Sequence, residues 1–76
     1  MSEKLPRVDC QQLVHVLEQV GFERKRQKGS HLHLWRERDK KRVTVPMHKG
    51  REIPIGTLRA ILRDANIDIE EFRQLL

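Results

Sequence analysis

The sequence contains one cysteine, Cys10, among its 76 residues. One thiol cannot form an internal disulfide framework, and its presence suits a reducing compartment. One cysteine with four scattered histidines does not match a structural zinc site, so we expect neither a metal nor another cofactor. No apolar run is long enough for a signal-peptide core or a membrane span. We therefore expect a protein of the cytoplasm with no membrane partner.

The chain also has no glycine-rich phosphate loop, no low-complexity tract and no internal repeat. These absences exclude a P-loop nucleotide site and a solenoid. The length fits one domain with a modest core, and we expect residues 1–76 to form that domain.

Acidic side chains are scarce in the middle of the chain. Residues 23–52 hold eleven Lys and Arg against four Asp and Glu, a net charge of +7, whereas the remaining residues carry −2. Such clustering is the electrostatic footprint of nucleic-acid binding. An anionic membrane fits less well, because the basic segment lacks the pattern of an amphipathic helix. The alternative is a solvated charged surface without a partner.

Hydrophobic periodicity predicts a helix, three strands, a second helix and a helical tail. Apolar residues recur at helical spacing over residues 10–20, after Asp9 and Gln12 in a capping-box pattern and before Gly21. Strands are expected at residues 22–27, 31–36 and 42–45, and further helices at residues 54–65 and 68–76. We expect an α+β two-layer sandwich, with both main helices on one face of an antiparallel sheet and the other face open to solvent.

The candidate site begins at the small-residue turn Gly29-Ser30, which leads directly into His31. Alternation places His31 and His33 on one side of the strand and the leucines on the other. Imidazole titrates nearest neutral pH, and RNA carries its own nucleophile in the 2′-hydroxyl. His31 is therefore a candidate for proton transfer in RNA cleavage. Lys28 and the neighbouring arginines are candidates for stabilising the negatively charged phosphorane. A solvated histidine or a simple phosphate contact is the alternative.

Other side chains are candidates for binding RNA. His33 is predicted to make a second phosphate contact, and the alternative role is that of the partner acid in catalysis. Trp35 could stack on a base if it shares the face of His33, or it could pack on the stems of Arg or Lys. Alternation predicts that Arg24 and Arg26 share one side of the first strand. The full set of predicted RNA contacts is Lys28, Gly29, Ser30, His33, Arg24, Arg26, Trp35, and His48 and Lys49 in the loop after the third strand.

Four motifs follow one another along the chain: Gly21-Phe22, Lys28–His31, Val43–Pro46 and Gly56–Arg63. In this order, from about Asp9 to Phe72, they closely resemble the HicA (YcfA-like) family of bacterial toxins. The resemblance implies a fold like a double-stranded-RNA-binding domain and a metal-independent endoribonuclease, an mRNA interferase that cleaves mRNA. It also implies a HicB-like antitoxin that covers the active site, and it makes the histidine of the Gly-Ser-His element, His31, the catalytic residue.

Two other functions are compatible with the sequence. A non-catalytic RNA-binding module could use the same fold and charge, and a His31→Ala variant that loses cleavage but keeps RNA affinity would argue for the enzyme. A DNA-binding helix pair, formed by residues 54–65 and 68–76, fits less well. The basic charge lies on the predicted strands and loops rather than on a recognition helix.

Overall fold

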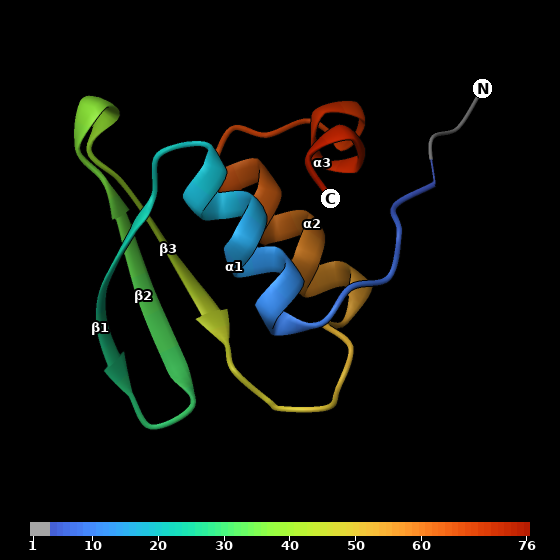
Figure 1. Ribbon diagram of the computed structural model, residues 1–76, viewed down its shortest axis with the longest axis horizontal. Coiled ribbons are helices and arrows are strands. Elements are labelled where there is room, and N and C mark those ends of the chain that lie inside the picture. Colours follow the sequence, from blue (N-terminus) through green and yellow to red (C-terminus); the bar gives the residue numbers. More distant parts are fainter. Residues whose placement is uncertain (1–3) are drawn as a thin grey trace.

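The structure, a computed structural model, describes residues 4–76. In chain order its elements are α1 (Cys10–Gln19), β1 (Glu23–Lys28), β2 (His31–Arg36), the 3-10 helix η1 (Glu37–Asp39), β3 (Lys41–Pro46), α2 (Ile55–Asp64) and α3 (Ile69–Leu75) (Figure 1). The strands form one antiparallel sheet in the order β1-β2-β3. The predicted α+β class is confirmed, and each predicted boundary lies within one residue of the observed one.

The helix boundaries follow from capping residues. The Asp9 carboxylate accepts a hydrogen bond from the Gln12 backbone N–H at 2.8 Å, and the Gln12 side chain accepts one from the Asp9 N–H at 3.0 Å. This reciprocal pair is the predicted capping box at the start of α1. Gly21, with φ +102°, and Asn66, with φ +60°, follow α1 and α2 in the left-handed region. Asp68 caps α3 by accepting from the Glu71 N–H at 2.7 Å.

The hydrophobic core lies between the helices and one face of the sheet. Leu32 and Leu34 of β2 and Val43 and Val45 of β3 are buried on this face. The helices contribute the remaining core side chains, among them Leu13, Val14, Val16, Leu17, Leu58, Ile61, Leu62 and Phe72. Each such side chain contributes about 1.5–3 kcal/mol through burial. This apolar face fixes the register of β2, because a slip of one residue would expose its leucines. In the part of the chain that the structure describes, no helix is long and apolar enough to cross a membrane.

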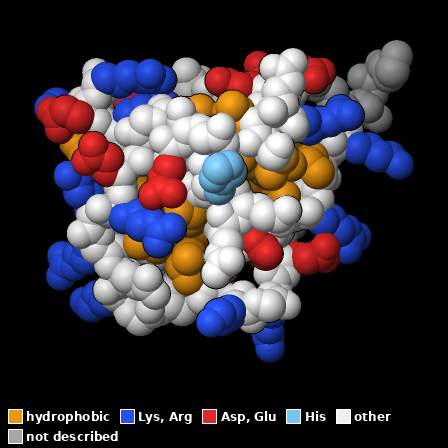
Figure 2. All heavy atoms as spheres, viewed as in Figure 1, with side chains coloured by type: hydrophobic (Ala, Val, Ile, Leu, Met, Phe, Trp, Pro, Cys, Tyr) orange, Lys and Arg blue, Asp and Glu red, His pale blue; other side chains and the backbone are white. Residues whose placement is uncertain are grey.

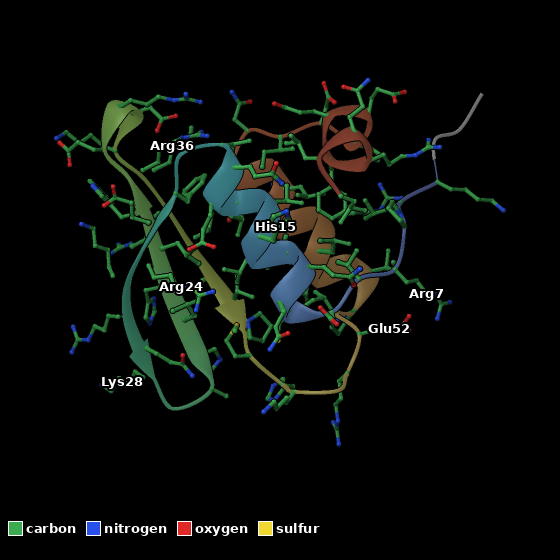
Figure 3. The ribbon with its side chains drawn as sticks, viewed as in Figure 1. Arg7, His15, Arg24, Lys28, Arg36 and Glu52 are labelled. Carbon is green, nitrogen blue, oxygen red and sulfur yellow. The ribbon has the colours of Figure 1, made fainter. Side chains whose placement is uncertain are left out.

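Arg36, at the end of β2, is a charged residue within this core and is only 4% exposed. Its guanidinium donates two hydrogen bonds to the Asp39 carboxylate, at 2.9 and 3.0 Å. It also donates to the backbone carbonyls of Val20 and Ala65, at 3.0 and 2.9 Å, and lies 4.5 Å from the centre of the Phe22 ring. One side chain thus joins the sheet to the carboxyl ends of α1 and α2 (Figure 3).

Gly21 leaves the space that this arginine needs. A Cβ atom at Gly21 would lie 3.3 Å from Cδ of Arg36, and the φ of +102° would strain any other residue there. The Gly21-Phe22 motif is therefore explained by the buried arginine as well as by the helix end.

We expect acid to weaken the fold through Asp39. Hydrogen bonds from Arg36 hold the pKa of this carboxyl below its usual range. In the unfolded chain the pKa is higher, so the interaction stabilises the fold above the unfolded pKa and is lost as the pH falls through the folded one. An Asp39→Asn variant should have a lower Tm than the wild type at neutral pH. The difference should narrow below about pH 4.

Thermal unfolding at several pH values tests this expectation. The matched control is Asp64→Asn, which removes an exposed carboxylate that lies 3.9 Å from Arg63. Its Tm should stay close to that of the wild type at every pH, because exposed ion pairs contribute little. A difference between wild type and Asp39→Asn that is unchanged in acid would contradict the assignment.

Candidate nucleic-acid interface

Alternation along β2 divides its side chains between two faces of the sheet. Leu32, Leu34 and Arg36 are buried on the helix side, while His31 is exposed and His33 and Trp35 are half-buried on the other. The cross-strand neighbours extend this second surface on β1 and β3. We call it the open face; its members are Glu23, Lys25, Arg26, Lys28, His31, His33, Trp35, Arg42 and Thr44. The predicted sharing of a face by the two histidines is confirmed, and Trp35 lies on that face as well.

A β-bulge in β1 changes which cations reach the open face. Arg24 lies opposite Leu34 and Arg26 opposite His33, so a register shift occurs between them. Leu34 and His33 are adjacent in β2 and point to opposite faces of the sheet. Their partners Arg24 and Arg26 therefore also point to opposite faces. The prediction that they share a side is therefore wrong. Arg24 points toward α1, where its Nε lies 3.2 Å from Glu18 Oε2 (Figure 3).

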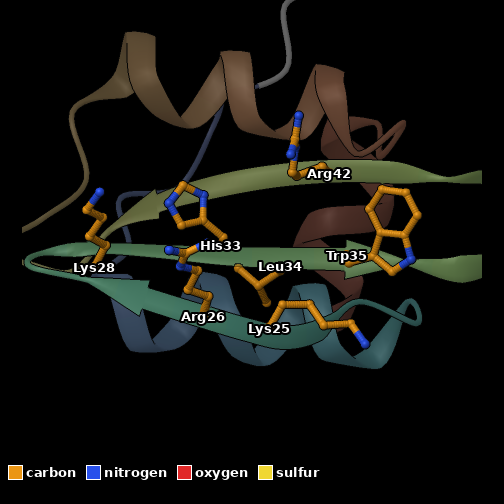
Figure 4. Close-up of a pocket in the computed structure, with 7 residues that line it drawn as sticks. All are labelled: Lys25, Arg26, Lys28, His33, Leu34, Trp35 and Arg42. Carbon is orange, nitrogen blue, oxygen red and sulfur yellow. The ribbon is translucent and has the colours of Figure 1, made fainter.

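The bulge has a second consequence. It places Lys25 beside Arg26 on the open face, where both contribute to one hollow of about 530 Å³ (Figure 4). The side chains and backbone that line this hollow are those of Lys25, Arg26, Lys28, His33, Leu34, Trp35 and Arg42. Four of these seven residues are cations. Glu23 is a nearby carboxylate, 3.5 Å from Lys25 in an exposed pair, so the hollow keeps a positive balance.

His31 stands at the start of β2, where the backbone is held on both sides. It lies opposite Lys28 in β1 and Pro46 in β3. The turn before it is a two-residue hairpin whose first residue, Gly29, has φ +60°, as such hairpins require. The Met47 N–H donates to the Ser30 carbonyl at 2.6 Å and closes this end of the sheet. The exposed imidazole is therefore carried by a fixed backbone, with an exposed lysine as its cross-strand neighbour.

The next side chain along the open face, His33, has a fixed ring. Its Nδ1 lies 3.0 Å from the hydroxyl oxygen of Thr44, its neighbour on β3. That contact leaves Nε2 for a ligand in the hollow, which His33 lines (Figure 4). Trp35 follows on the same face, and its indole N–H donates to Glu37 Oε1 at 2.9 Å. Three ring side chains thus form a row along β2.

Most of the chain matches a known protein family. The family model described as the HicA toxin of bacterial toxin–antitoxin systems matches residues 10–67, from the start of α1 to just past α2. The chain belongs to the HicA toxin family. It is thus a toxin of a toxin–antitoxin pair and has an antitoxin as its partner. No curated protein matches it closely enough to add a more specific description.

The matched range of this HicA toxin contains the whole open face and all the predicted site residues. Lys28, the Gly29-Ser30 turn and His31 adjoin one another at one end of the sheet. His48 and Lys49 lie exposed in the loop that leaves β3 at the same end. Arg24 alone among the predicted residues faces the helix layer.

The helix layer of this HicA toxin has a different surface. Figure 2 shows acidic and basic side chains interspersed there, and the histidine visible on it lies over α1. That residue is His15, which is exposed and carries no predicted role (Figure 3). Among residues 4–76, no cluster of three or more His, Cys, Asp or Glu side chains could hold a metal ion.

Two cations of the hollow, Lys25 and Arg42, are not among the site residues predicted from the sequence. Unbroken alternation along β1 would put Lys25 and Arg26 on opposite sides, and the bulge brings both to the open face. Arg42 could have been found, because the alternation of β3 puts it on the face opposite Val43.

Proposed function

We propose that this HicA-family toxin is a metal-independent endoribonuclease that cleaves mRNA, with His31 as its general acid/base. The observation that carries the proposal is the exposed imidazole at the start of β2. Lys28 is its cross-strand neighbour and also lines the hollow. Four cations line this hollow, which lies on the same face of the sheet as His31. Such a surface attracts a polyanion. The exposed imidazole would exchange a proton with the RNA bound there.

The chemistry requires little else from the protein. The 2′-oxygen of RNA forms a bond to phosphorus, and the bond from phosphorus to the 5′-oxygen breaks. One proton leaves the 2′-hydroxyl and one reaches the departing 5′-oxygen, and His31 transfers one of them. Lys28 and Arg26 lie opposite His31 and His33 and would stabilise the charge that develops on the phosphoryl oxygens.

The proposed function also includes the domain organisation, the compartment, the antitoxin and the remaining RNA contacts. We take residues 1–76 as one HicA-like domain that acts in the cytoplasm. Its antitoxin is a HicB-like protein that covers the open face and offers carboxylates to Lys28 and Arg26. Gly29, Ser30, His33, Trp35, His48 and Lys49 complete the RNA contacts. Arg24, which pairs with Glu18 on the helix side, joins them only if that exposed pair opens.

The experiment that tests the proposal uses a substrate with one altered nucleotide. The purified chain should cut an mRNA fragment, and a single 2′-deoxy substitution at the cut nucleotide should block that cut while leaving others. Cleavage that continues at the substituted nucleotide would rule out the 2′-oxygen as nucleophile. Absence of both cleavage and growth arrest by the wild-type chain would overturn the nuclease assignment.

RNA binding should weaken steeply with salt. If the four cations of the hollow each neutralise one phosphate of a single strand, the logarithm of the binding constant should fall with the logarithm of salt concentration with a slope of about −3. Lys28→Ala should make the slope shallower by about 0.7. Fluorescence anisotropy of a labelled RNA at several salt concentrations measures both values.

The matched control is Arg73→Ala, which removes an exposed charge from α3 instead of the open face. It should leave the slope within error of the wild type. Equal changes for Lys28→Ala and Arg73→Ala would show that net charge, and not the open face, determines binding.

A further inference from the structure

We infer that Trp35 is a stacking platform for one unpaired base, so that the RNA crosses the open face as a single strand. The inference rests on the proposed function and adds the form of its substrate. Trp35 is the one aromatic side chain on the open face, where it is half-buried and lines the hollow. Aromatic rings beside a positive groove are how proteins hold single strands without reading a full base sequence.

The indole N–H has a hydrogen-bond partner before any ligand arrives, which favours one orientation of the ring. Its N–H donates to Glu37 at 2.9 Å, and Glu37 is in turn paired with Lys40. Hydrogen bonds from Lys40, and next from Trp35, hold the pKa of Glu37 below its usual range. A ring held in this way loses little freedom on binding, which is the advantage of a preorganised platform.

Cations lie on both sides of the platform. Arg42 is the cross-strand neighbour of Trp35 on β3. On β1 the cross-strand neighbour of Trp35 is Glu23, whose carboxylate lies 3.5 Å from Lys25 in the bulge (Figure 4). A phosphate that flanks a base on the indole would be nearest to positive charge on the Arg42 side, because Lys25 on the other side is paired with Glu23. His31 lies four residues away along β2, about 13 Å. The stacked base would be bound within a few nucleotides of the cleaved bond.

A duplex cannot use this platform. Its bases are stacked on one another, so their faces are covered, whereas the bases of a loop or a single strand can turn outward onto an aromatic ring. The competing explanation is that Trp35 packs on the stems of Lys25 and Arg42 and contacts no base. The two explanations differ in what they predict for the indole when RNA binds.

The sequence offers a direct probe, because Trp35 is its only tryptophan and it has no tyrosine. Tryptophan fluorescence of the whole chain therefore reports on Trp35 alone. The ligand is a 2′-O-methyl RNA oligonucleotide, which has no free 2′-hydroxyl and is not cut. We expect the single strand to quench the fluorescence, and the same sequence in a duplex, or inorganic polyphosphate, to bind with little quenching.

The outcomes separate the two proposals. Binding of the single strand, measured by anisotropy, without quenching would overturn the platform and leave the nuclease proposal intact. Equal quenching by the duplex would also overturn it. Failure of every RNA to bind would overturn both. Quenching by the single strand alone supports the platform, even if cleavage by the wild-type chain has not been detected.

A pair of variants gives an independent test. Trp35→Leu should lower affinity for the single strand roughly 5- to 150-fold, the range typical of the loss of one stacking side chain. Trp35→Phe keeps an aromatic face and should recover most of that loss. Thermal unfolding of both variants shows whether they fold. Equal affinities for Trp35→Leu and the wild type would overturn the platform.

Discussion

Replacement of His31 by alanine is expected to abolish growth arrest and to lower the rate of RNA cleavage by roughly a hundredfold or more. The reason is that the exposed imidazole at the start of β2 would transfer a proton in the bond-breaking step, and alanine cannot. Binding should change much less, because Lys25, Arg26, Lys28 and Arg42 remain. The measurement pairs the single-turnover cleavage rate with the affinity for an uncut 2′-O-methyl RNA.

The fold should survive this substitution. His31 is exposed and lies outside the core, so its removal should change the free energy of unfolding by less than about 0.5 kcal/mol. The matched control is His15→Ala, an equally exposed histidine on α1, which should leave both cleavage and stability unchanged. Normal cleavage by His31→Ala would refute the catalytic assignment. Loss of activity together with a large fall in Tm would make His31 a structural residue.

Much of the fold could be predicted because its signals are local. The capping box at Asp9 and the left-handed Gly21 mark the ends of α1 within a few residues of sequence. In β2 the leucines alternate with His31 and His33, so period-2 alternation identifies both the strand and its buried face. The face of the catalytic candidate was therefore predictable without any tertiary information.

The bulge in β1 could not be predicted in the same way. All six residues of this strand, ERKRQK, are exposed and polar. Without a buried side chain, no apolar position shows where alternation breaks. The register shift puts Arg26 on the same face as Lys25 and leaves Arg24 on the helix side, so the wrong prediction concerns the charges of the site and not the fold.

The burial of Arg36 could not be predicted from the sequence either. An arginine within a charged segment is typical of a solvent-exposed strand end. Its partners are Asp39, three residues on, and the carbonyls of Val20 and Ala65, which are 16 and 29 residues distant. Only the assembled fold brings these acceptors together. Helix ends leave carbonyls unpaired, and this side chain satisfies one at each of two helix ends.

Replacement of Arg36 by alanine is expected to destabilise the fold by about 3 kcal/mol. Removal of the Arg36 side chain leaves the Val20 and Ala65 carbonyls without this donor, and it opens a cavity beside Phe22. It also removes the partner of Asp39, whose carboxylate is one-third exposed and so remains partly solvated. In a domain of this size such a loss should lower Tm by about 12–24 °C. Thermal and denaturant unfolding measure it.

Two further variants show whether the geometry of the guanidinium, and not only its charge, causes the loss. Arg36→Lys keeps the charge but cannot donate in parallel to Asp39 and also reach both carbonyls, so it should recover less than half of the lost stability. Arg38→Ala, at an exposed arginine two residues away, should change the free energy of unfolding by less than about 0.5 kcal/mol. If Arg36→Ala unfolded at the same temperature as Arg38→Ala, the buried arginine would not hold the sheet to the two helices. Full recovery by Arg36→Lys would show that the charge alone is sufficient.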